Sequence, residues 1–163
     1  MTQKQIENIR NGLGSYALEK RFVCRKGKMP IDPKNGYFGA KANDPSTWGS
    51  LDQALEALVK YRAKGVDGIG IELGDGLCGI DIDHCVDEHG TVSPQARDVI
   101  KVMDSYTESS VSGTGIHIIF EGAIPDGARR KNGLEMYSDG RYFTLTGNLL
   151  SLGYDELEVA NGI

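Results

Sequence analysis

The sequence predicts an α+β domain in which a mixed or antiparallel sheet is flanked by helices. Helix-like and strand-like segments follow one another without regular alternation, and after the third helix-like segment the chain continues as a series of short strand-like runs. A doubly wound parallel sheet is disfavoured, because it needs a helix between successive strands. The chain of 163 residues, 39% hydrophobic and 25% charged, is long enough for one domain with a single core.

Three segments carry helical patterns. Residues 3–13 are expected to form a short helix. Ser50 and Gln53 have the spacing of a capping box and precede apolar residues at helical spacing, which predicts a second helix. A third helix is predicted from its N-cap Ser93 and from Pro94 at the first helical position.

The strand-like segments are short and are separated by turns rich in glycine. A strand is expected over 21–28, followed by a long irregular loop over 28–48 that holds three of the five prolines. The GDG turn between 68–73 and 78–83 predicts that these two segments form a β-hairpin. Further short strands are predicted at TESSV, GIHIIFEG, GLEMYS and RYFTLTG.

The net charge of −5 argues against a protein whose whole surface is positive for tight nucleic-acid binding. It is compatible with a local basic groove, because several cations are placed where they can form one. These cations are Lys26, Lys28, Arg129, Arg130, Lys131 and Arg141.

The cysteine content and the absence of targeting signals predict a reduced, cytoplasmic setting. The number of cysteines is odd, and no two of them form a CxxC motif; they are Cys24, Cys78 and Cys85. The N-terminus lacks the apolar core of a signal peptide, and no apolar run approaches the ~20 residues of a membrane helix. The spacing of Cys78 and Cys85 with His84 and His89 fits no regular zinc-finger pattern.

The stretch GIDIDHC, residues 79–85, carries two acids within an apolar run. Asp81 and Asp83 would lie on the same side of a strand, ~7 Å apart by the strand rise. Like charges this close are costly unless a cation lies between them. The pair is therefore either two solvated acids at a strand end or a ligand pair for a hard divalent cation such as Mg²⁺ or Mn²⁺.

A glycine-rich turn precedes the strand that carries His117. Ser112, Gly113 and Gly115 belong to this turn, whose backbone N–H groups can approach an anion closely. Ile119 is expected to share the face of His117, with the other apolar residues of the strand on the opposite face. His117 is either structural or a donor to the phosphates of a bound nucleotide.

Glu135 lies within a later strand, and Arg141 opens the strand after the SDG turn. The two side chains can form a cross-strand ion pair. In the functional alternative, Glu135 is a third metal-binding carboxylate and Arg141 binds phosphate through its forked donors.

Taken in order, these motifs resemble the archaeo-eukaryotic primase superfamily, and within it the primase-polymerase domains of phages and plasmids. The resemblance rests on a strand with DxD, then SGTGIH, then an acidic strand that closes in RYFTLTG. It extends to RFVCRKGKMPIDPKNG, NDPSTWGSLDQAL, DGIGIEL and SYTESSVSGTGIHIIFEG, and so covers about residues 21–148. It implies the RRM-like catalytic core of that superfamily.

The resemblance also implies roles for individual residues. Asp81, Asp83 and Glu135 would hold one or two catalytic Mg²⁺ or Mn²⁺ ions, and His117 would contact the phosphates of the incoming nucleotide. Further nucleotide contacts would come from the turn residues and two cations: Ser112, Gly113, Gly115, Arg141 and Lys28.

The implied activity is template-directed nucleotidyl transfer in phage or plasmid replication, as DNA primase and DNA polymerase in the cytoplasm of a bacterial host. The expected partners are single-stranded DNA template and primer, nucleoside triphosphates and a replicative helicase, either fused or separate. We expect residues 1–163 to be one catalytic domain of a longer replication protein, without that protein's helical region and helicase. The alternative is a catalytically silent accessory module that binds a nucleotide or a protein partner on the same fold.

Overall fold

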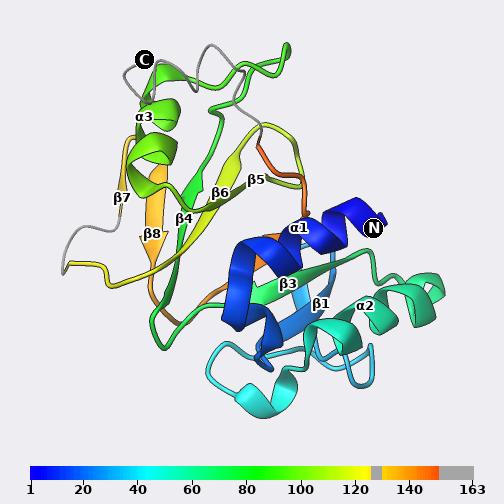
Figure 1. The fold of residues 1–163 in the computed structure, drawn as a ribbon. Helices are drawn as coiled ribbons and strands as arrows, with labels where there is room; N and C mark the ends of the chain where they lie inside the picture. The colour runs from blue at the N-terminus through cyan, green and yellow to red at the C-terminus, as the bar shows by residue number, and fades with distance from the viewer. Residues whose placement is uncertain (126–129, 151–163) are drawn as a thin grey trace.

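A computed structural model describes residues 1–125 and 130–150 of the chain and confirms the α+β class. Within these residues the strands form two antiparallel sheets, which Figure 1 shows one beside the other. The first sheet has the order β2-β1-β3-β9. Its strands are β2 (Met29–Ile31), β1 (Phe22–Lys26), β3 (Gly68–Glu72) and β9 (Tyr142–Leu145).

Two helices cover one face of the first sheet. Apolar side chains from alternate positions of β1, β3 and β9 pack against these helices and form the larger core. The predicted capping box is present, because Gln53 N donates to Ser50 Oγ and Ser50 N donates to Gln53 Oε1. The helices are α1 (Gln3–Leu13) and α2 (Leu51–Lys60), followed by the 3₁₀ turns Gly14–Leu18 and Arg62–Lys64, respectively.

The second sheet has the order β5-β6-β4-β8-β7, and α3 (Pro94–Met103) packs on one face of it. As the strand pattern predicted, Ile116 and Ile118 point into the core beneath α3, whereas Ile119 points to the larger core on the other side. Ser93 is the N-cap of α3, and its Oγ accepts from Ala96 N. The strands are β5 (Tyr106–Ser109), β6 (Ile116–Glu121), β4 (Leu77–Ile82), β8 (Leu134–Tyr137) and β7 (Arg130–Lys131).

The hairpin predicted from the GDG turn is wrong. β3 pairs with β1 and β9, and β4 pairs with β6 and β8, so the two segments belong to different sheets. The turn residues do adopt positive φ, but they close only an isolated bridge between Gly74 and Leu77. The turn therefore carries the chain from one sheet to the other. The burial of apolar area in the two cores outweighs the turn signal and decides which strands pair.

The long loop predicted over 28–48 is only partly correct. Its first residues form β2, which pairs with β1 as an antiparallel hairpin, and Pro45–Thr47 forms a 3₁₀ turn. Pro30 is tolerated in β2 because this strand lies at the edge of the sheet. Arg129 lies outside the described residues. So does the tail from residue 154, YDELEVANGI, whose sequence also begins as a helix-like segment. No helix among the described residues is both long and apolar enough to cross a membrane.

Candidate functional site

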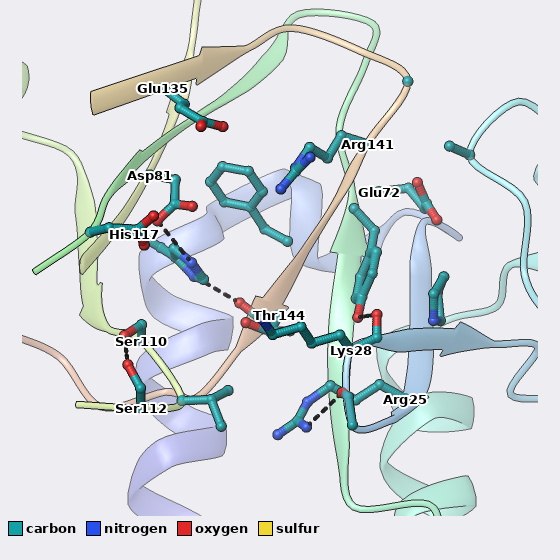
Figure 2. A pocket seen from close by; sticks show the side chains of 18 of the residues that line it. Arg25, Lys28, Glu72, Asp81, Ser110, Ser112, His117, Glu135, Arg141 and Thr144 are labelled. Carbon is teal, nitrogen blue, oxygen red and sulfur yellow. Dashed lines mark hydrogen bonds and ion pairs between the residues drawn. The ribbon is translucent and has the colours of Figure 1, made fainter. Parts of the chain in front are cut away.

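A cavity of about 820 Å³ lies where the uncovered faces of the two sheets meet (Figure 2). Side chains from β1, β3 and β9 form one wall, and side chains from β4, β6 and β8 form the other. Seven of the residues predicted from the sequence line this cavity. They are Lys28, Asp81, Asp83, Ser112, His117, Glu135 and Arg141.

A row of charged residues crosses the second sheet and carries the centre of this site. The strand register places Glu108, His117, Asp81, Glu135 and Arg130 opposite one another on β5, β6, β4, β8 and β7. Cross-strand neighbours in such a row lie close enough for their side chains to interact. The row thus sets an acid on each side of the histidine, and a third acid and a cation follow toward the sheet edge.

Asp81 lies at the middle of the row and is largely buried. Its Oδ1 is 3.6 Å from His117 Nε2. Burial raises the pKa of Asp81, the positive charge of His117 opposes the rise, and the carboxylates of Asp83 and Glu135 add to it. The site therefore places Asp81 where a further positive charge would stabilise its ionised form.

His117 connects the two sheets. Its Nδ1 donates to the backbone oxygen of Thr144 on β9 at 3.2 Å (Figure 2). The same Nδ1 lies 3.7 Å from Glu108 Oε1. Burial alone would lower the pKa of His117, but Glu108, Asp81 and the Thr144 carbonyl together raise it above its ordinary value. The ring is thereby held in one orientation with Nε2 toward Asp81.

Glu108 is a site residue that the sequence did not reveal. Its side chain is 0% exposed, and its carboxylate accepts from Thr146 N at 2.9 Å, Gly147 N at 2.9 Å and the Tyr106 hydroxyl at 2.7 Å. These bonds fix the segment after β9 against β5, directly behind His117. Protein donors thus take the place of the water that the Glu108 carboxylate loses on burial.

We expect Glu108→Gln to lower the free energy of unfolding by about 2 kcal/mol, because an amide N–H₂ would then face backbone N–H donors. Urea denaturation followed by circular dichroism measures the change. Glu7→Gln, at an exposed position on α1, is the matched control and should leave the free energy of unfolding unchanged. Equal stability of the Glu108 and Glu7 variants would contradict the role given to Glu108.

Of the two alternatives for Glu135 and Arg141, the cross-strand ion pair does not form. β8 and β9 belong to different sheets, and Glu135 Oε1 instead lies 3.7 Å from Arg130 Nε of β7. The Tyr137 hydroxyl donates to Glu135, and the Arg141 guanidinium lies 4.4 Å from the centre of the Tyr137 ring. The guanidinium N–H groups of Arg141 are therefore available to bind a partner other than Glu135.

The glycine-rich turn contributes Ser112 to the cavity, together with its neighbours Ser110 and Val111. The predicted contact residues Gly113 and Gly115 do not line it. Gly113 provides the positive φ of the turn, and a Cβ at Gly115 would lie 2.8 Å from the Ile82 carbonyl oxygen. These glycines let the turn approach the end of β4.

Cations line the wall opposite the acids. Arg141 and Lys28 do so as predicted, and the buried Arg25 joins them from β1. Arg25 lies over Gly68, where a Cβ would come within 2.3 Å of its guanidinium, and pairs with Asp67 at 3.2 Å. The wall of β4, β6 and β8 is therefore acidic, and the facing wall carries these three cations together with Asp67 and Glu72. Of the other predicted groove cations, Arg130 pairs with Glu135, and Lys26 and Lys131 do not line the cavity.

Glu72, at the end of β3, is the second acid that the sequence did not reveal. It is 0% exposed, and neither of its carboxylate oxygens has a hydrogen-bond partner. Burial raises its pKa to about 7. No sequence signal separates it from an ordinary exposed glutamate, because its burial depends on β1 and β9 on either side.

No group of three or more His, Cys, Asp or Glu side chains within residues 1–125 and 130–150 is arranged to hold a metal ion. The chemistry of the acidic wall nevertheless suits a hard cation. Mg²⁺ binds proteins through one or two carboxylates and takes its other ligands from water and substrate phosphates. Asp81 and Asp83 supply such carboxylates, and a bound cation would favour the ionised form of Asp81, whose pKa is raised by burial and by its acidic neighbours.

Comparison with known proteins identifies a phage relative. The chain is 38% identical, in an alignment of 141 residues that covers 82% of the chain, to a DNA primase-polymerase of Nitratiruptor phage NrS-1. The aligned region spans 19% of that relative's length. No protein-family model matches the chain. The sequence comparison therefore relates this chain to a phage DNA primase-polymerase, as the ordered motifs predicted.

Proposed function

We propose that this chain is the nucleotidyl-transfer core of a DNA primase-polymerase. The observation that supports this most strongly is the cavity between the sheets, which brings the DxD acids, His117 and Glu135 opposite Lys28 and Arg141. An acidic wall that faces Arg25, Lys28 and Arg141 suits a nucleoside triphosphate, whose phosphates need both cations and donors. The similarity to a phage enzyme of this name supports the same reaction class.

In this proposal Asp81 and Asp83, with Glu135, hold one or two Mg²⁺ or Mn²⁺ ions. Bound there, such ions would neutralise charge on the phosphates and on the attacking 3′-hydroxyl oxygen. Arg141 and Lys28 bind the outer phosphates, and Ser112 donates a hydroxyl from the turn. His117, fixed by Glu108 and Thr144, donates to a phosphate oxygen through Nε2. The protein thereby supplies rigid positioning, and Arg141 and Lys28 stabilise the pyrophosphate that leaves.

The partners proposed with this reaction are nucleoside triphosphates, a single-stranded DNA template with its primer, and a replicative helicase that is fused or separate. The proposed setting is replication of a phage or plasmid in the cytoplasm of a bacterial host. Residues 1–163 would be one catalytic domain of a longer replication protein.

The second candidate is an accessory module that binds a nucleotide or a protein partner without catalysis. The acidic net charge of −5 favours it, since a polymerase must hold DNA. Against it stands the costly burial of Asp81 beside other acids, for which a module without metal chemistry has no use.

A thermal shift with deoxynucleoside triphosphate separates the two candidates. We expect Mn²⁺ and the nucleotide together to raise the melting temperature more than the sum of their separate effects, because each completes the binding site of the other. Differential scanning fluorimetry at several nucleotide concentrations measures this. A shift with nucleotide that is the same with and without Mn²⁺ would favour the silent module.

A further inference from the structure

An exposed aromatic pair lies on the loop between β2 and α2, outside the cavity. Tyr37 is 68% exposed and Phe38 is 67% exposed, and their ring centres are 5.2 Å apart in an edge-to-face arrangement. Two adjacent large aromatic residues at this exposure leave apolar area in water, which marks an interaction site.

The loop holds these rings in fixed positions. The side-chain oxygen of Asn35 accepts from the backbone N–H groups of Tyr37 and Phe38, each at 2.8 Å. Asp32 N donates to the Phe38 carbonyl oxygen at 2.8 Å. The pair is therefore presented on an ordered turn, and binding a partner would require little ordering of the backbone.

A third aromatic residue and several cations adjoin the pair. Gly36 lies directly on the ring of Tyr61, where a Cβ would come within 2.2 Å. Lys60 and Lys64 lie 5.3 and 5.8 Å from the centre of the Tyr61 ring, and Lys26 lies 5.7 Å from that of Tyr37. We call this surface the lysine–aromatic patch; it consists of Lys26, Tyr37, Phe38, Lys60, Tyr61 and Lys64.

The charge of the patch is not balanced by the described part of the chain. None of its three lysines pairs with a carboxylate there, and Arg62 adds a further exposed cation between Lys60 and Lys64. Asp67 is engaged by Arg25 and by Gly27 N. In a chain with net charge −5, this concentration of cations predicts a polyanionic partner.

Flat rings beside cations fit single-stranded nucleic acid better than an acidic peptide. Bases stack on aromatic side chains, and the phosphates between them pair with lysines. The hairpin that carries Lys26 also leads to the cavity, because Gly27, Lys28 and Pro30 line its edge. A strand on the patch would thus reach the nucleotide site along this hairpin.

We propose that the lysine–aromatic patch binds the single-stranded DNA template on its way to the cavity. The proposal rests on the function proposed above. It identifies a local surface that can hold DNA in a chain whose net charge is negative.

The test is fluorescence anisotropy of a labelled single-stranded oligonucleotide with the full chain, without nucleotide or metal. We expect the double variant Tyr37→Ala with Phe38→Ala to bind at least about tenfold more weakly, since stacking contributes about 1–3 kcal/mol per base. Lys60→Gln with Lys64→Gln should make the slope of log K against log salt shallower by about 1.4.

The matched control is Lys4→Gln with Lys101→Gln, which removes the same charge from exposed positions on α1 and α3. Its affinity should stay close to that of the unmodified chain. Unchanged affinity of the aromatic variant, or an equal loss in the control, would overturn the proposal. Equally tight binding of a poly-glutamate peptide would also overturn it, in favour of an acidic protein partner.

Failure of this proposal is distinguishable from failure of the proposed function. If the chain extends a primer but the patch variants bind and extend as well as the unmodified chain, only the patch assignment fails. If the chain binds DNA through the patch but incorporates no nucleotide, the patch assignment stands and the proposed function fails.

Discussion

Replacement of Asp81 by asparagine should abolish nucleotide incorporation, with a loss of about a thousandfold or more. The carboxylate is the only part of the side chain that changes, and loss of a metal ligand in phosphoryl transfer removes several kcal/mol of transition-state stabilisation. The same substitution should leave the melting temperature of the metal-free protein equal or higher. Asp81 has a raised pKa in the folded protein, so its ionised form opposes folding at neutral pH.

Two measurements on one sample check this prediction: incorporation of a labelled nucleotide, and thermal unfolding without metal. Asp75→Asn, in the turn between β3 and β4, is the control and should retain activity. Incorporation by the Asp81 variant at the rate of the unmodified chain would remove Asp81 from the catalytic site. A lower melting temperature would show that Asp81 supports the fold.

Replacement of Glu72 by glutamine should stabilise the protein by about 3 kcal/mol at pH 8, since one pKa unit corresponds to about 1.4 kcal/mol. Glu72 is buried without a partner, and its pKa rises from 4.5 to about 7 on folding. Its contribution to stability is therefore fully present below pH 4.5 and is lost as the pH rises toward 7. Glutamine has nearly the same shape and carries no charge.

Urea denaturation at several pH values from 4 to 8 measures the difference between the Glu72 variant and the unmodified chain. The difference should vanish near pH 4.5 and grow to its full size above pH 7. Glu88→Gln, at an exposed position, should show no such dependence. A difference that is independent of pH would show that Glu72 is not the buried acid that the structure describes.

Local signals in the sequence were sufficient to predict most of the elements. The capping box at Ser50 and Gln53 and the N-cap at Ser93 mark helix starts through hydrogen bonds within a few residues. Alternation likewise assigned Ile118 and Ile119 to opposite faces of β6. Such features depend on near neighbours, and the sequence alone contains them.

Strand pairing could not be predicted in the same way. The GDG turn is a strong hairpin signal, yet β3 and β4 pair with strands far along the chain. The pairing depends on how two cores divide the apolar side chains, which local turn chemistry does not encode. The structural alternative for Glu135 and Arg141, a cross-strand ion pair, was wrong for the same reason, since it assumed that β8 and β9 are neighbours.

The candidate site was predicted where its residues belong to motifs and was missed where they are brought in by topology. Asp81, Asp83 and His117 stand out because acids in an apolar strand and a histidine after a glycine-rich turn are unusual. Glu108 and Glu72 look ordinary in the sequence, and only cross-strand contacts show that they are buried.

Primer extension on a primed single-stranded DNA template, with deoxynucleoside triphosphates and either Mg²⁺ or Mn²⁺, tests the central claim most directly. We predict that the unmodified chain lengthens the primer and releases one pyrophosphate for each nucleotide added, and that the Asp81→Asn variant does neither. Absence of extension with both metals, in a chain that still binds nucleotide, would contradict the claim and identify the protein as a binding module.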